Sequence, residues 1–405
     1  MAGPLDGIRV VDFTKMIAGP LATMTLADQG ADVIKVEPPN GGDHTRLVAT
    51  QRAGFSASFV NNNRNKRSIV LDLKKPDGLA TAHQLIAGAD VVVQNFRAGV
   101  ADRIGIGEAK ARELNERVIY TSIAGFGFSG PYVDKPVFDP LVQAVSGLTT
   151  VQAGSDDQRP RLVRTILPDK LTGIQASQAI SAALFARERT GKGQHIELSM
   201  IDTVVSFLWS SDMGGHTFVG DEMEKEQAQS FIDLIYETAD GYVSVAVMQN
   251  KEWLAFTDAL EKPDLREDPR FQTAALREEN KDARLGAMQD AIAGFTSAEI
   301  IERLEARDVP CAPVLTRREM IRHPQIEANG LIVETDHPVA GRLRQTRTPA
   351  RFSETAPEHR FGAPLLGADT TAILKEAGYS PSDIEALLAS GAAAEPVPTK
   401  ESEKV

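Results

Sequence analysis

Short runs of β-branched residues alternate with helical patterns through the first half of the chain, and this alternation restricts the fold more than any other feature. Residues 8–13 form a strand pattern, residues 20–29 form a helical pattern that ends at Gly30, and residues 33–37 form the next strand pattern. Together they make a βαβ unit of about 30 residues. Repetition of such units predicts a parallel sheet covered by helices on both faces.

The alternation extends to about residue 220 and then gives way to a different pattern. Further strands are expected at 68–73, 90–94, 118–123 and 194–199, and helices at 77–87, 108–115 and 201–218. Residues 221–229 are charged and have no apolar period, which indicates a linker. A strand pattern at 241–247 is followed by amphipathic segments at 251–260, 282–293 and 297–307.

These patterns predict an α/β protein with a Rossmann-like large domain and a smaller α+β domain. Residues 1–220 form the first part of the large domain, and residues 221–325 form the small domain with its linkers. The chain then returns to the large domain over 326–390, through a proline- and arginine-rich segment. Residues 391–405 lack apolar periodicity, so we expect a disordered tail.

Composition excludes several classes of partner. The formal net charge of −12 argues against nucleic acid, which needs a concentrated basic surface. The single cysteine, Cys311, allows no disulfide within the chain and no cysteine-based metal site, and the histidines lack metal-ligand spacing, so no metal is expected. There is no run of about 18 apolar residues and no signal-peptide pattern, so we expect a cytoplasmic protein that does not contact membranes.

Asp169 precedes a long helical pattern and follows Pro168, a residue that cannot lie inside a helix. Asp169 is therefore expected at or near the N-cap, where its carboxylate accepts helix N–H groups and the macrodipole favours its ionised form. Local sequence alone favours a purely structural cap. A functional role needs support from elsewhere in the chain.

Two turns and a set of basic residues could contact a ligand. The turn at 14–20 places Ala18 and Gly19 near a helix N-terminus at the end of a strand, and residues 125–131 are glycine-rich, but neither has the dinucleotide or Walker pattern. The basic residues lie near strand ends, where they would either hold a polyanion or belong to solvated loops: Arg64, Lys66, Arg67, Lys74, Lys75, Arg97 and Arg103.

Many short segments in order resemble the class III coenzyme A transferases, the family of formyl-CoA transferase and carnitine CoA-transferase. The matching segments cover residues 5 to 388 and include 5–13, 18–20, 30–37, 42–43, 65–69, 71–74, 95–97, 191–194, 310–314 and 363–367. Each segment is weak alone, but their order makes the resemblance specific.

The resemblance implies that Asp169 is the covalent catalyst. Its carboxylate would attack an acyl-CoA thioester and pass through an aspartyl anhydride and an aspartyl-CoA thioester before an acceptor carboxylate takes the CoA. Coenzyme A is then a substrate, with no permanently bound cofactor. The family also implies an interlocked homodimer and the following CoA contacts in this chain: Met16, Ala18, Leu71, Lys74, Asn95, Phe96, Arg103, Lys135 and Met200.

Departures from the family pattern concern the acyl pocket. Ile17 and Phe138 stand where formyl-CoA transferase has polar residues, which indicates a less polar pocket. Asp139 is either a helix cap or a residue that orients the substrate or Asp169.

Two alternatives to a transferase are a 2-methylacyl-CoA racemase and a non-catalytic CoA-binding protein. The racemase is disfavoured because Phe138 replaces the histidine that it uses as one of two bases. The binding protein would keep the basic residues without needing Asp169.

Overall fold

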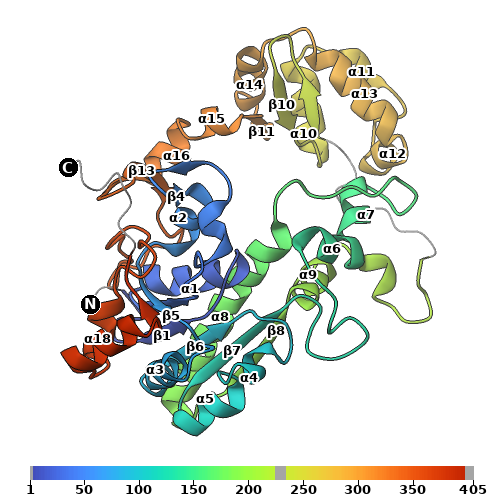
Figure 1. Cartoon of the computed structure of the whole chain (residues 1–405). Coiled ribbons are helices and arrows are strands. Elements are labelled where there is room, and N and C mark those ends of the chain that lie inside the picture. Colours follow the sequence, from blue (N-terminus) through green and yellow to red (C-terminus); the bar gives the residue numbers. More distant parts are fainter. Residues whose placement is uncertain (1–2, 224–233, 397–405) are drawn as a thin grey trace. The chain divides into compact units, whose positions relative to one another are not determined.

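The computed structural model describes residues 3–223 and 234–396 (Figure 1). The chain divides into two compact units, one of residues 1–229 and 331–405 and the other of residues 230–330. Each unit has its own apolar core.

The described part of the first unit is built on a seven-stranded sheet with the order β14-β5-β2-β1-β6-β7-β8. Its strands are β1 (Arg9–Asp12), β2 (Asp32–Glu37), β5 (Lys66–Leu71), β6 (Val91–Gln94), β7 (Ile119–Ala124), β8 (His195–Ser199) and β14 (Ala393–Ala394). All pairings are parallel except that of β14 with β5. The chain runs outward from β1 through β2 to β5 and then returns to β6 on the other side. The strand order therefore reverses between β1 and β6, where doubly wound folds place their ligands.

Alternate residues of each central strand enter opposite cores, as the period of two requires. Val11 and Val92 pack against α3 (Pro76–Ala87), α5 (Glu108–Leu114), α17 (Thr370–Glu376) and α18 (Pro381–Ala389). Val10 and Val91 face α1 (Ala18–Asp28) and α8 (Leu167–Thr190). This confirms the predicted α/β fold with helices on both faces (Figure 1).

Further elements of the first unit lie between these strands or after the second unit. The helices are α2 (Ala57–Asn63), α4 (Val100–Arg103), α6 (Asp139–Val145), α7 (Leu148–Ala153) and α9 (Met200–Trp209), with 3₁₀ turns at His44–Leu47 and Gly214–His216. Short hairpins pair β3 (Gln51–Arg52) with β4 (Phe55–Ser56) and β12 (Ile332–His337) with β13 (Gly341–Thr346).

The second unit joins a small antiparallel sheet to a group of helices. The sheet has the order β11-β10-β9, formed by β9 (Ile235–Glu237), β10 (Tyr242–Val245) and β11 (Cys311–Pro313). Its core is rich in aromatic residues, with Trp253, Phe256 and Phe271 buried. The helices are α10 (Asn250–Ala259), α11 (Pro263–Glu267), α12 (Ala274–Glu279), α13 (Lys281–Ile292), α14 (Ser297–Glu305), α15 (Arg317–Met320) and α16 (Pro324–Ala328).

Two predicted segments differ in the structure. The helix expected over 201–218 ends at Trp209, because serine, aspartate and glycine follow, residues that favour turns over helix continuation. The expected disordered tail is ordered at its start, where Ala393 pairs with Leu71 and is buried. Residues 397–405 of that tail lie outside the described residues. Within the described residues, no helix is both long and apolar enough to cross a membrane.

Candidate active site

A cavity of about 450 Å³ lies at the carboxyl ends of β1, β6 and β7, next to the point where the strand order reverses. Apolar side chains form much of its wall, including Phe126, Val137 and Met200. Three cationic side chains, those of Lys15, Arg97 and Lys135, also contribute to the lining. An apolar wall with a few charged groups suits a ligand that carries both an apolar portion and negative charge.

Asp169 lines this cavity from the first turn of α8. Asp169 lies near the N-cap but not at it: the N-cap residue is Ile166, and Pro168 lies within the first two helical positions. Proline fits there because the first helical N–H groups have no acceptor inside the helix. Asp169 therefore projects from the helix as a first-turn acid and is available to contact another element.

The contact that Asp169 makes is with a second helix N-terminus. Its Oδ1 accepts a hydrogen bond from the backbone N–H of Ala18, the first residue of α1, at 3.3 Å. Two helix N-termini thus meet at one carboxylate, and both favour a negative charge there. The start of α1 also lies close to α8, since a Cβ on Gly173 would lie 2.7 Å from the carbonyl oxygen of Ala18.

Burial acts against the helix N-termini at Asp169. Burial and, next, the negative charge of Asp139 raise the pKa of Asp169 to about 6, and only the Ala18 N–H lowers it. The carboxylate therefore remains ionised at neutral pH but is poorly solvated. A poorly solvated carboxylate is a stronger nucleophile than one surrounded by water.

Asp139 is the buried neighbour of Asp169, at the start of α6. Its Oδ1 accepts from Nε2 of Gln143 at 2.6 Å, and its Oδ2 accepts from the backbone N–H of Asp169 at 3.4 Å. The N-cap residue of α6 is Phe138, so Asp139 does not occupy the cap position. Asp139 instead contacts the start of α8 through the backbone of Asp169. Burial raises the pKa of Asp139 as well.

The loop between β1 and α1 forms another wall of the cavity. Asn95, which follows β6, accepts the backbone N–H of Lys15 at 2.9 Å and donates to the Lys15 carbonyl at 2.8 Å. Met16 then adopts a left-handed conformation with φ of 68°, which is uncommon for a residue with a side chain. The loop therefore has one defined course from β1 to Ala18.

A second cavity, of about 200 Å³, lies beside the loop and shares Lys15 and Phe96 with the first. Leu71 and Lys74 line it from the end of β5, together with Phe13 and Val36. The Lys15 ammonium lies 5.1 Å from the centroid of the Phe96 ring. The shared residues make one continuous lined surface along the carboxyl ends of the strands.

Most residues proposed from the sequence therefore gather around these cavities. Nine line the larger cavity: Met16, Ala18, Asn95, Phe96, Lys135, Phe138, Asp139, Asp169 and Met200. Leu71 and Lys74 line the smaller one.

Ile17 and Arg103 are the proposed residues that line neither cavity. Ile17 is the N-cap residue of α1, and the left-handed turn at Met16 leaves Met16 and Ala18, but not Ile17, in the lining. Arg103 ends the short helix α4 and is exposed. The expectation that Ile17 forms part of the pocket is therefore not met in this chain's geometry.

Three of the basic residues grouped in the sequence analysis have structural partners. Arg64, Lys66 and Arg67 form ion pairs with Asp28, Asp12 and Asp32, respectively. Because their charges are paired with carboxylates within the fold, these three residues do not form a phosphate-binding surface.

The sequence analysis missed Lys15 and Val137 as lining residues. Lys15 belongs to the turn at 14–20, which the sequence indicates as a ligand-binding position. Its closeness to Ala18 in the sequence is the signal that could have identified it as a lining residue. Val137 packs where a Cβ on Gly125 would lie 2.2 Å from its Cγ1. Gly125 is thus required by close packing of the cavity wall.

The family description for CoA-transferase family III matches residues 5–370 of this chain. The chain belongs to this family. As a family III CoA-transferase, it is 31% identical over 396 residues to the succinyl-CoA:glutarate CoA-transferase of Homo sapiens, covering 96% of this chain and 89% of that protein. It is 32% identical to the formyl-CoA:oxalate CoA-transferase of Escherichia coli O157:H7, covering 96% and 99% of the two chains.

A solved structure supports the same assignment for this CoA-transferase. The crystal structure of a CAIB/BAIF family protein from Brucella suis superposes with a TM-score of 0.83 at 30% identity, covering 93% of this chain and all of that one. The acetyl-CoA:oxalate CoA-transferase of Acetobacter aceti is 33% identical over 92% of this chain and 96% of its own. The three enzymes from Homo sapiens, Escherichia coli and Acetobacter aceti are all named as CoA-transferases.

Proposed function

We propose that this CoA-transferase moves coenzyme A from an acyl-CoA donor to a carboxylic acid acceptor with Asp169 as the covalent nucleophile. The observation that carries the proposal is the half-buried Asp169 carboxylate in the wall of the larger cavity, held by the Ala18 N–H at 3.3 Å. Acyl-CoA and a carboxylate are substrates of the relatives by their names. CoA is accordingly a substrate here and not a resident cofactor.

The first half-reaction opens the donor thioester. An oxygen of Asp169 attacks the thioester carbonyl carbon, the C–S bond breaks, and CoA leaves as a thiolate with a mixed aspartyl anhydride in place. The thiolate then attacks the Asp169 carbonyl carbon, and the donor acid leaves as a carboxylate. Asp169 is now a CoA thioester.

The second half-reaction repeats these steps with the acceptor. Its carboxylate attacks the aspartyl thioester, the released thiolate attacks the acceptor's carbonyl carbon, and Asp169 returns as a carboxylate. No proton is gained or lost across the cycle, and each step exchanges one activated carbonyl for another. Burial of Asp169 assists because it weakens nucleophile hydration and limits access of water to the anhydride.

The proposed roles of the lining residues follow from their positions. Lys74 and Leu71 in the smaller cavity, with Asn95 and Phe96 between the cavities, fit contacts to the nucleotide part of CoA. Phe138, which is 66% exposed, lines the acyl end near Asp169. A racemase is not favoured, since Phe138 offers no base beside Asp139.

Replacing the nucleophile without changing its shape tests the proposal. Asp169→Asn should abolish transfer, because an amide does not attack a thioester, while CoA binding stays within about threefold. The folded-state pKa of Asp169 lies above its unfolded value of 3.8, so stability is lost as the pH rises from that value through about 6, and the loss is complete at pH 7. The variant should therefore also raise the Tm at pH 7, by roughly 2–4 °C.

Asp202→Asn is the matched control, since Asp202 is a first-turn acid of α9 that is exposed and lies outside both cavities. Transfer by Asp202→Asn should equal that of the wild type. Substantial transfer by Asp169→Asn would refute the covalent role, and loss of CoA binding would point to a binding role instead.

A further inference from the structure

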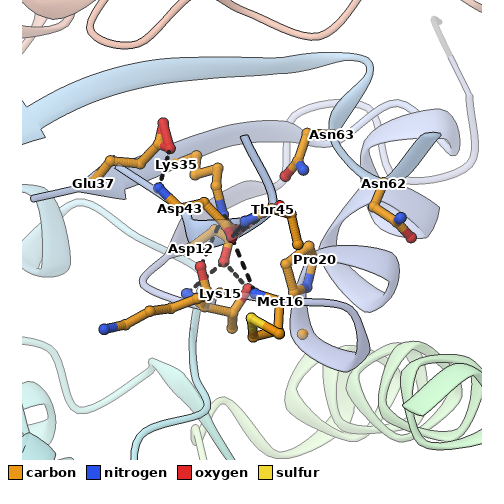
Figure 2. A network of polar contacts seen from close by, with 12 residues as sticks. Asp12, Lys15, Met16, Pro20, Lys35, Glu37, Asp43, Thr45, Asn62 and Asn63 are labelled. Carbon is orange, nitrogen blue, oxygen red and sulfur yellow. Dashed lines mark hydrogen bonds and ion pairs between the residues drawn. The ribbon is translucent and has the colours of Figure 1, made fainter. Parts of the chain in front are cut away.

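Beneath the β1–α1 loop lie four buried charged residues that the proposed chemistry does not use. We call Asp12, Lys35, Asp43 and Lys66 the buried charge network; each is at most 1% exposed. Lys66 pairs with Asp12 at 3.0 Å, and Lys35 pairs with Asp43 at 3.0 Å. Figure 2 shows Asp12, Lys35 and Asp43 grouped beside Lys15 and Met16. Burying charged groups costs free energy, so the presence of two buried ion pairs next to this loop calls for an explanation.

Members of the buried charge network form separate hydrogen bonds to the loop backbone. Asp12 accepts the N–H of Thr14 at 2.8 Å, and Lys35 donates to the Thr14 carbonyl at 2.8 Å. Asp43 accepts the N–H of Met16 at 3.2 Å. Asn95 binds the backbone N–H and carbonyl of Lys15. Side chains from other elements therefore fix the loop backbone from Thr14 to Met16.

Asp43 is the member that acts on the strained residue. Met16 has φ of 68°, and a residue with a Cβ holds this conformation only where its surroundings impose it. The same Oδ1 that accepts from Met16 also accepts from the backbone N–H and the hydroxyl of Thr45, each at 2.9 Å. The acceptor is thus itself fixed in direction. Two residues beyond Met16 in sequence, Ala18 presents its N–H to Asp169.

Lys35 keeps Asp43 ionised in this buried place. Burial by itself would raise the pKa of Asp43, but the Lys35 charge lowers it, and the N–H groups of Thr45 and Met16 lower it further. An ionised acceptor forms a stronger bond to the Met16 N–H than a neutral one.

We propose that Asp43, held by Lys35, is a positioning residue that keeps Met16 in its left-handed conformation and thereby keeps the Ala18 N–H on the Asp169 carboxylate. The inference rests on the proposed function of Asp169. Asp43 does not touch Asp169; it acts through the loop. Its loss should therefore change the reactivity of Asp169 beyond any general loss of stability.

Asp43→Asn tests this role with Asp28→Asn as the matched control. Asp28 is also buried and also ion-paired, to Arg64, but it lies at the far end of α1 from the loop. Asp43→Asn should lower kcat about tenfold while KM for acyl-CoA changes less. The acid limb of its pH–rate profile should move to higher pH, because the Ala18 N–H lowers the pKa of Asp169 and would be lost. Asp28→Asn should lower Tm without moving kcat or the acid limb.

A double-mutant cycle with Met16→Gly separates positioning from a general structural effect. Glycine adopts positive φ freely, so the loop no longer depends on Asp43. The kcat loss caused by Asp43→Asn should shrink to about threefold or less in the Met16→Gly background. If Asp43→Asn does not fold, Asp43→Glu, which keeps the charge but displaces the oxygens by one methylene, should show the same acid-limb shift and the same relief by Met16→Gly.

Two outcomes distinguish this inference from the proposed function. If Asp43→Asn matches Asp28→Asn, or if its kcat loss is unchanged by Met16→Gly, the positioning role is overturned. If Asp169→Asn retains transfer, the covalent role of Asp169 fails whatever Asp43→Asn does.

Discussion

At the scale of single residues, the chemistry depends on the carboxylate of Asp169, whose ionisation is favoured by some neighbouring groups and disfavoured by others. The N-termini of α1 and α8 favour the charge of Asp169, whereas burial and Asp139 disfavour it. The balance gives a pKa of about 6, which keeps the nucleophile ionised at neutral pH but less stabilised than a solvated aspartate.

Asp139→Asn tests whether Asp139 tunes this balance. Its negative charge raises the pKa of Asp169, so removing the charge should lower that pKa and move the acid limb of the pH–rate profile to lower pH. Above pH 7 the rate should fall about tenfold or less, since a less basic nucleophile is less reactive. The measurement is kcat/KM for acyl-CoA between pH 4.5 and about 8.

Asp77→Asn is the control for that series, because Asp77 is an exposed first-turn acid of α3 outside both cavities. An acid limb that stays in place in Asp139→Asn, or moves upward, would contradict electrostatic tuning by Asp139.

At the scale of elements, hydrophobic periodicity predicts the strands of the sheet and the helices that cover it, because each of these elements buries at least one face. The strand predicted at 33–37 is β2 at Asp32–Glu37, and the helix predicted at 77–87 is α3 at Pro76–Ala87. Ends were less predictable: α8 begins two residues before Asp169, and its N-cap residue, Ile166, has no side chain that marks a cap. The strand β14 escaped prediction because two alanines carry no period.

The candidate site was predictable only for residues in turns that follow the strands at the reversal of strand order. Turns after β1 and β6 lie at the reversal of strand order, which general rules identify as a ligand position. The partners of Arg64 and Lys66 are distant in sequence, so local reading could not tell a phosphate-binding side chain from a buried ion pair. The role proposed for Asp43 depends on the φ of Met16, which sequence pattern does not reveal.

At the scale of the whole molecule, exposed apolar side chains on the first unit support the homodimer that the family resemblance implied. Ile174 and Phe185 on α8 are 59% and 60% exposed, and Phe207 and Trp209 on α9 are 49% and 51% exposed. Apolar side chains grouped on two helices are typical of a surface that another chain covers. We therefore propose that a second copy of the chain covers this surface, in the interlocked arrangement that the family resemblance implies.

Interlocked chains cannot separate by dissociation alone, since one chain would first have to unfold. Sedimentation equilibrium should give twice the chain mass of 43.7 kDa, with no monomer appearing on dilution into the nanomolar range. A mass of one chain, or a dimer that dissociates on dilution while remaining folded, would contradict interlocking.

The most direct test of the central claim is chemical capture of the intermediate on Asp169. The enzyme is incubated with acyl-CoA and hydroxylamine, which attacks anhydrides and thioesters, and the digested protein is analysed by mass spectrometry. The proposed mechanism predicts a hydroxamate on Asp169 that forms only when acyl-CoA is present and is absent from Asp169→Asn. Turnover of acyl-CoA and acceptor under the same conditions with an unmodified Asp169 peptide would contradict it.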